Sequence, residues 1–142
     1  MKVSARNVFE GTVTRITTGA VNSEVELETA GGDAIVAIVT EASIKRLGLA
    51  VGAKAFAFVK APWVIVLGED VPMRFSARNQ LSGTVSVINK GMVSSDVRIR
   101  LPGGAEVQAV ITNDAVAELA LAVGKPASAL FKASHVILGV PA

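Results

Sequence analysis

The sequence predicts a mostly β fold: two tandem OB-like five-stranded barrels, each with one short helix between its third and fourth strands. The first observation behind this prediction is an internal repeat, because Ser4-Ala5-Arg6-Asn7 returns as Ser76-Ala77-Arg78-Asn79. The same offset of 72 residues aligns 4–70 with 76–142 without a gap, and 27 of the 67 aligned positions are identical. Such a repeat has to be recognised before a fold is assigned. The second and third observations are alternating apolar segments of strand length and a helix start signal, present in both copies.

Hydrophobic alternation predicts the first three strands of each copy. In the first copy, residues 8–16 alternate and are rich in β-branched side chains, and Gly11 predicts a bend within them. In residues 23–28 apolar residues alternate with glutamates, which predicts a strand with one solvent-exposed face. Gly31-Gly32-Asp33 predicts a hairpin turn. Residues 34–39 are apolar throughout, which is typical of a strand buried on both faces.

A short helix and two more strands complete the copy. The Thr40 hydroxyl can cap a helix over residues 41–47, and Gly48 stands where a helix end favours a residue at positive φ. Strands are then expected over 54–59 and 63–67. The order of three strands, one helix and two strands is that of a small OB-like barrel.

The repeat divides the chain into a first domain over residues 1–69, a linker over 70–75 and a second domain over 76–142. Units of roughly 65 residues are marginal alone, because their surface is large relative to their core. Yet 51% of the residues are hydrophobic. We therefore expect the units to pack against one another, within the chain and between chains.

Composition excludes several classes of protein. The absence of cysteine excludes disulfides, iron–sulfur clusters and thiol catalysis, and a single histidine excludes a structural zinc site, so no cation held directly by the protein is expected. No segment approaches the ~18 apolar residues of a membrane span, so no membrane partner is expected. The N-terminal residues lack the apolar core of a secretory signal, which predicts a cytoplasmic location. The net charge of +2 is too small for general attraction to nucleic acid.

Few charges recur between the copies, and those that do predict an anion pocket. The identical basic pairs are Arg6 with Arg78 and Lys60 with Lys132. Serines lie two residues before each arginine, and a threonine precedes each predicted helix. Hydroxyls, guanidinium and ammonium groups form a set rich in donors and poor in acceptors, which suits a small deprotonated oxyanion. The alternative is that these are ordinary solvated surface residues.

Four motifs together resemble the molybdenum-pterin-binding-protein-like (Mop) domain: S-A-R-N, I-V-T-E-A-S, L-G-L-A-V-G and V-K-A-P-W. Two copies over the whole chain resemble the tandem, or di-Mop, molybdate-binding members of this family. The resemblance implies an OB-like barrel, a homotrimer in which six Mop units cluster, and oxyanion sites at the seams between units. It implies molybdate as the ligand, with tungstate as an analogue and no organic cofactor.

The resemblance also implies which residues bind. The seam sites would use Ser4, Ala5, Arg6, Asn7, Thr40, Ser43, Lys60, Ala61, Ser76, Ala77, Arg78, Asn79, Thr112, Lys132 and Ser134. Sites near a three-fold axis would use Gly19, Ala20, Val21, Asn22, Gly91, Val93 and Ser94. One position departs from the pattern, because Ser43 is matched by Ala115. Second-copy pockets therefore lose a hydroxyl unless Thr112 or Ser134 substitutes for it.

The expected function is reversible molybdate binding for storage or homeostasis. An enzyme is not expected, because no Walker loop, dinucleotide fingerprint or nucleophile elbow is present, and His135, which replaces Trp63, is expected to have a packing or surface role. An OB-like barrel could instead bind single-stranded nucleic acid through aromatic platforms. Against this, the aromatic fraction is 4%, and Phe56 and Phe58 are expected in the core. A structural oligomer with incidental anion sites is the other alternative.

Overall fold

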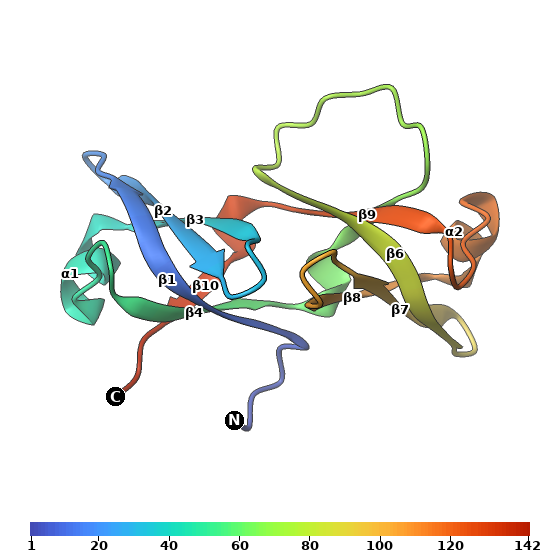
Figure 1. Cartoon of the computed structure of the whole chain (residues 1–142), viewed down its shortest axis with the longest axis horizontal. Helices are drawn as coiled ribbons and strands as arrows, with labels where there is room; N and C mark the ends of the chain where they lie inside the picture. The colour runs from blue at the N-terminus through green and yellow to red at the C-terminus, as the bar shows by residue number, and fades with distance from the viewer.

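The computed structural model describes all 142 residues, and each copy of the repeat has the same order of elements (Figure 1). The first copy comprises β1 (Asn7–Thr17), β2 (Asn22–Thr29), β3 (Ala34–Thr40), α1 (Glu41–Leu47), β4 (Lys54–Val59), the 3₁₀ turn η1 (Ala61–Trp63) and β5 (Ile65–Leu67). The second comprises β6 (Asn79–Lys90), β7 (Ser94–Arg100), β8 (Glu106–Thr112), α2 (Asn113–Glu118), β9 (Pro126–Phe131), the 3₁₀ turn η2 (Ala133–His135) and β10 (Ile137–Gly139). The predicted fold class is confirmed: two five-stranded β units, each with one short helix after its third strand.

The last strand of each copy belongs to the sheet of the other copy. One sheet has the order β10-β4-β1-β2-β3, and the other has β5-β9-β6-β7-β8. Ile137 of β10 pairs with Phe58 of β4, and Ile65 of β5 pairs with Leu130 of β9. In Figure 1 the red C-terminal segment accordingly returns to the blue and cyan strands of the first copy. Each five-stranded unit is therefore built from both halves of the sequence.

The local signals for α1 are confirmed. The Thr40 side chain accepts a hydrogen bond from the Ser43 N–H at 3.1 Å, and Gly48 ends the helix with φ of 64°. In α2 the cap is the same, with Thr112 accepting from the Ala115 N–H, but Ala120 stands at the position of Gly48 with φ of 50°. The C-cap of the second helix, Leu119, is right-handed, and the left-handed residue that follows it, Ala120, carries a Cβ.

The sequence predicted a bend in β1 at Gly11, but the pairing of β1 with β2 is regular at that residue. Gly11 stays in register opposite Thr29, and the register instead shifts between Val13 and Arg15. A Cβ on Gly11 would lie 2.8 Å from the carbonyl oxygen of Glu28, so the glycine is needed for close approach of β2 rather than for a bend. The equivalent shift in β6 lies between Val85 and Val87.

The hydrophobic core is continuous across the two copies, with 24 buried residues in one cluster. In the strand over 34–39, Ile35, Val36 and Ala37 are buried in succession, whereas Ala34 and Ile38 are exposed. The prediction of a strand buried on both faces therefore holds only for its centre. The prediction that Phe56 and Phe58 lie in the core was wrong. Both are half-buried, and the core face of β4 is formed by small residues, namely Ala55, Ala57 and Val59.

The hairpins β2–β3 and β7–β8 also touch each other. A Cβ on Gly103 would lie 2.3 Å from the carbonyl oxygen of Gly31, so these two turns fit together because residue 103 lacks a side chain. The linker over 70–75 is exposed and forms the long green arch in Figure 1. Neither α1 nor α2 has the length and hydrophobicity that a membrane-spanning helix requires.

Candidate oxyanion site at the seams between the copies

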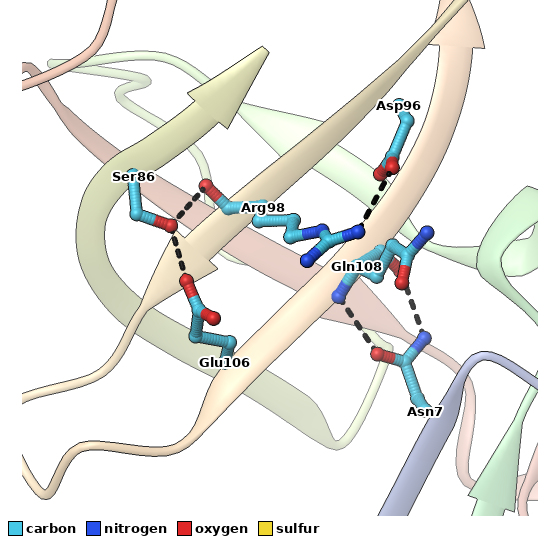
Figure 2. A network of polar contacts seen from close by, with 6 residues as sticks. All are labelled: Asn7, Ser86, Asp96, Arg98, Glu106 and Gln108. Carbon is cyan, nitrogen blue, oxygen red and sulfur yellow. Dashed lines mark hydrogen bonds and ion pairs between the residues drawn. The ribbon is translucent and has the colours of Figure 1, made fainter. Parts of the chain in front are cut away.

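The asparagine of each S-A-R-N motif joins one copy to the other. Asn7 donates to the Gln108 carbonyl at 2.8 Å and accepts from the Gln108 N–H at 2.7 Å, as Figure 2 shows. Asn79 makes the same pair of bonds with the Val36 backbone, both at 2.8 Å. Both asparagines are buried. Since Val36 and Gln108 are 72 residues apart, the two bridges are related by the repeat.

The recurring basic residues stand directly beyond these bridges. Asn7 pairs with Val59 and Asn79 with Phe131, so Arg6 is next to Lys60, and Arg78 next to Lys132, at one end of each sheet. All four side chains are exposed. The preceding residues Ser4 and Ser76 are exposed as well, Ala5 and Ala77 are half-buried, and Ala61 and Ala133 are buried.

Each of these pairs of basic residues lies near a contact between the two copies, which we call a seam. The first seam is the contact of β3 with η2 and β10, and the second seam is the contact of β8 with η1 and β5. Residues of β2 and α1 line a cavity at the first seam. The structure therefore places Arg78 and Lys132 beside the first seam, and Arg6 and Lys60 beside the second. Thr40 and Ser43 belong to the first seam, and Thr112 to the second.

The arginines at the two seams have different partners. The Arg78 guanidinium forms an ion pair with Glu24 across the first seam. At the second seam Arg6 donates to its own segment, to the Val3 carbonyl at 2.8 Å and the Ser4 carbonyl at 3.3 Å. The counterpart of Glu24 is Asp96, and Figure 2 shows it paired with Arg98, at 3.5 Å. Only the first seam has an acid bound to its recurring arginine.

The first seam contains a cavity of about 390 Å³. Its polar wall comprises Asn22, Thr40, Ser43 and Arg46 from the first copy and Ser134 from the second, and its remaining wall is apolar. Thr40 donates to the Ser43 hydroxyl at 2.8 Å. Three hydroxyls, an amide and a guanidinium line this cavity, and no carboxylate does. Ser134 therefore lies with Ser43 at the first seam rather than beside Ala115 at the second.

The loops predicted for the three-fold-axis sites are tied to the helix starts. In the first copy the Ser23 hydroxyl donates to the Glu41 carboxylate at 2.5 Å, and the Glu41 N–H donates to the Val21 carbonyl at 2.9 Å. In the second copy Asn113 takes the place of Glu41 and donates to the Gly91 carbonyl at 3.0 Å. The loop residues Gly19, Ala20, Val21, Asn22, Gly91, Val93 and Ser94 are all exposed.

The residues Trp63 and His135, which match in the repeat, stack on each other. Their ring centroids are 4.9 Å apart with an interplanar angle of 36°. Lys60 lies over the Trp63 ring, 5.4 Å from its centroid. This agrees with the packing role expected for His135. No group of three histidine, cysteine, aspartate or glutamate side chains is arranged to hold a metal ion.

Both copies of the repeat match a known family. The sequence model of the TOBE domain matches residues 3–66 and 76–138. The chain belongs to the TOBE domain family. The two matched ranges confirm the tandem organisation that the repeat predicted.

Relatives of this TOBE pair are associated with molybdenum by name. Molybdenum-pterin-binding protein MopA of Rhodobacter capsulatus is 45% identical over 141 residues, which are 99% of this chain and 53% of MopA. Molybdenum transport protein ModE of Herbaspirillum seropedicae is 45% identical over 140 residues, 99% of this chain and 52% of ModE. The chain spans about half the length of these curated relatives.

A solved structure similar to the TOBE pair over its whole length is that of ModG. It is described as a cytoplasmic molybdate-binding protein, in a crystal form with molybdate bound. The identity is 51%, the TM-score is 0.96, and the match covers 99% of this chain and 100% of ModG.

Sequence reasoning missed several polar residues of the TOBE pair's seams. Ser23 and Ser95 are buried and hold the loops to the helix starts, and their identity across the repeat was an available signal. Glu24 and Asp96 are the acids that recur, yet their pairing with arginines was not anticipated. Arg46 gave no signal of this kind, because its counterpart is Glu118.

Proposed function

We propose that this protein binds molybdate reversibly at the seams between its TOBE domains. The observation that supports this most directly is the first-seam cavity, which gathers Thr40, Ser43 and Ser134 from both copies together with Arg46. Arg78 and Lys132 stand at the same seam but do not line this cavity. The fold match to ModG, whose crystals contain molybdate, supports the same ligand. Tungstate is proposed as an analogue because it has the same charge and shape.

The chemistry required is binding without bond making or breaking. A dianion is costly to strip of water, so affinity must come from several charge-assisted hydrogen bonds formed at once. The hydroxyls and cations of the seams supply donors of this kind. Sulfate has the same charge and tetrahedral shape but is smaller, so a rigid cavity would leave some of its oxygens out of reach. We therefore propose discrimination against sulfate.

The residues proposed to bind at the seams are the fifteen that the sequence predicted, from Ser4 to Ser134. No single seam contains the predicted first-copy set, since Arg6 and Lys60 lie at the second seam and Ser43 at the first. A site that combines them requires a second chain. This supports self-association of the protein. We propose a homotrimer, in which the exposed loops Gly19–Asn22 and Gly91–Ser94 would form the additional sites. The exposed Ile65 and Ile137 on the edge strands β5 and β10 offer apolar surface for such contacts.

The proposed biological role is storage or homeostasis of molybdenum in the cytoplasm. The description of ModG as cytoplasmic supports the location. A dianion bound across a seam also stabilises the assembly that it bridges, so occupancy and assembly would be linked. No nucleic-acid partner is proposed, because the one tryptophan ring is occupied by Lys60 and His135.

Equilibrium dialysis with molybdate, tungstate and sulfate tests the proposal. We expect tight uptake of the first two and rejection of sulfate. The double variant Arg6→Ala/Lys60→Ala is expected to weaken molybdate binding by at least about tenfold, because a charge-assisted hydrogen bond contributes about 1.5–3 kcal/mol. Lys45→Ala/Lys125→Ala is the matched control, because it also removes two exposed positive charges and neither lysine is among the proposed binding residues. Molybdate stoichiometry and affinity unchanged in the double variant would contradict the assignment of these residues.

A further inference from the structure

Arg46 is the one basic side chain that lines the first-seam cavity. It stands in the last turn of α1, and neither the ion pairs nor the side-chain hydrogen bonds of the structure include it. Arg78, by contrast, is held by Glu24. The Arg46 guanidinium therefore has all of its N–H donors available for a ligand.

The surroundings of Arg46 suit an anion and no other charged ligand. The cavity also presents the hydroxyls of Ser43 and Ser134 as donors, while the Thr40 hydroxyl donates to Ser43 and so orients it. The lining includes no aspartate or glutamate. Its volume of about 390 Å³ has room for a tetrahedral oxyanion with several waters. The rest of its lining is apolar, formed in part by Val136 and Leu138 of the second copy, so no other charged group in the lining competes for the Arg46 guanidinium.

The repeat supplies an internal comparison. At the second seam the residue in the place of Arg46 is Glu118, so the charge is reversed. Ala115 replaces Ser43 there, and Pro62 replaces Ser134, so two hydroxyls are lost as well. All three differences remove attraction for a dianion, and the carboxylate of Glu118 adds repulsion.

We propose that Arg46 is a further oxyanion ligand that makes the first seam the tight dianion site of each chain, and that Glu118 makes the second seam a weak one. This inference rests on the proposed function, because it assigns a specificity-determining residue for the same ligand. It predicts that the two seams of a chain, although related by the repeat, fill at different molybdate concentrations.

The test is isothermal titration of the full-length protein with molybdate. We expect two classes of site in the unchanged protein, and Arg46→Ala is expected to weaken the tighter class by about tenfold or more. Lys45→Ala is the matched control, since Lys45 is the neighbouring exposed cation of α1 and does not line the cavity. Arg46→Lys is expected to restore part of the affinity, because it restores the charge without the planar fork.

The second seam provides a gain-of-function variant. Glu118→Arg is expected to tighten the weaker class of site while leaving the tighter one unchanged. Molybdate affinity in Arg46→Ala equal to that of Lys45→Ala, or no tightening in Glu118→Arg, would overturn the inference. Absence of molybdate binding by the unchanged protein would instead overturn the proposed function, and this inference with it.

Discussion

At the scale of single residues, the asparagine bridges are the strongest polar links between the copies. Replacing Asn79 by alanine removes two hydrogen bonds at once and leaves the buried N–H and carbonyl of Val36 without partners. Because an unsatisfied buried polar group costs about 1–3 kcal/mol, Asn79→Ala is expected to lower the free energy of unfolding by roughly 2–4 kcal/mol. Urea denaturation measures this change. Asn89→Ala, at an exposed position of β6, is the control, and equal stability of the two variants would contradict the bridging role.

The ion pair between Arg78 and Glu24 leads to a prediction about affinity. Molybdate that approaches Arg78 competes with the Glu24 carboxylate, so Glu24→Gln is expected to tighten binding at the first seam. Exposed ion pairs of this kind contribute about 0.2–1 kcal/mol of interaction free energy. Removing the competing pair is therefore expected to raise the molybdate affinity by up to about fivefold. Glu26→Gln makes the same change of net charge on the same strand and is the control. If titration shows that both substitutions raise the molybdate affinity equally, the effect comes from the change in net charge and Glu24 does not compete with the ligand.

The residues of the candidate site were predictable where the repeat conserved their charge. Arg6, Arg78, Lys60 and Lys132 stood out because most other charges differ between the copies. The partners of these residues were not predictable, because a repeat identifies positions and does not tell which copy each one faces. Ser134 illustrates this limit, since only the three-dimensional structure places it with Ser43.

At the scale of elements, the end of α2 should be strained where the end of α1 is not. Ala120 has φ of 50° at the position that Gly48 occupies in α1. A left-handed residue with a Cβ costs about 1–2 kcal/mol, which is partly offset because glycine is more flexible in the unfolded chain. Ala120→Gly is therefore expected to raise the free energy of unfolding by roughly 0.5–1 kcal/mol. Thermal denaturation compares it with Ala122→Gly, which relieves no such strain; a loss of stability in both would contradict the prediction.

Most elements were predictable because their signals are local. The alternation of β2, the cap Thr40 and the end signal Gly48 act within a few residues of one another. The predicted strand over 63–67 is shorter in the structure, because residues Ala61–Trp63 form a 3₁₀ turn before β5 begins. Which face of β4 is buried depended on the space inside the unit, and a sequence pattern does not contain that information.

At the scale of the whole molecule, the exchange of β5 and β10 was beyond sequence reasoning. The two strands have similar apolar sequences, Ile65–Leu67 and Ile137–Gly139, and either could pair with β4 or β9 on pattern alone. The 3₁₀ turns η1 and η2 lead into β5 and β10, and each turn contacts a strand of the other copy, η1 with β8 and η2 with β3. The exchange makes the two halves of the sequence parts of one folding unit.

The exchange predicts that the two repeats cannot unfold separately. Leu138 is buried in β10, which belongs to the second copy but completes the first-copy sheet, and both sheets share one hydrophobic cluster. Removing buried methyl groups by Leu138→Ala costs about 2–5 kcal/mol, and this loss is expected to destabilise both sheets together. Differential scanning calorimetry should show a single transition that shifts down as a whole by several degrees. Leu49→Ala, in the other half of the same cluster, should shift that transition in the same way. Two separate transitions, with only one displaced by each substitution, would mean that the halves are independent domains and that the seams join them only loosely.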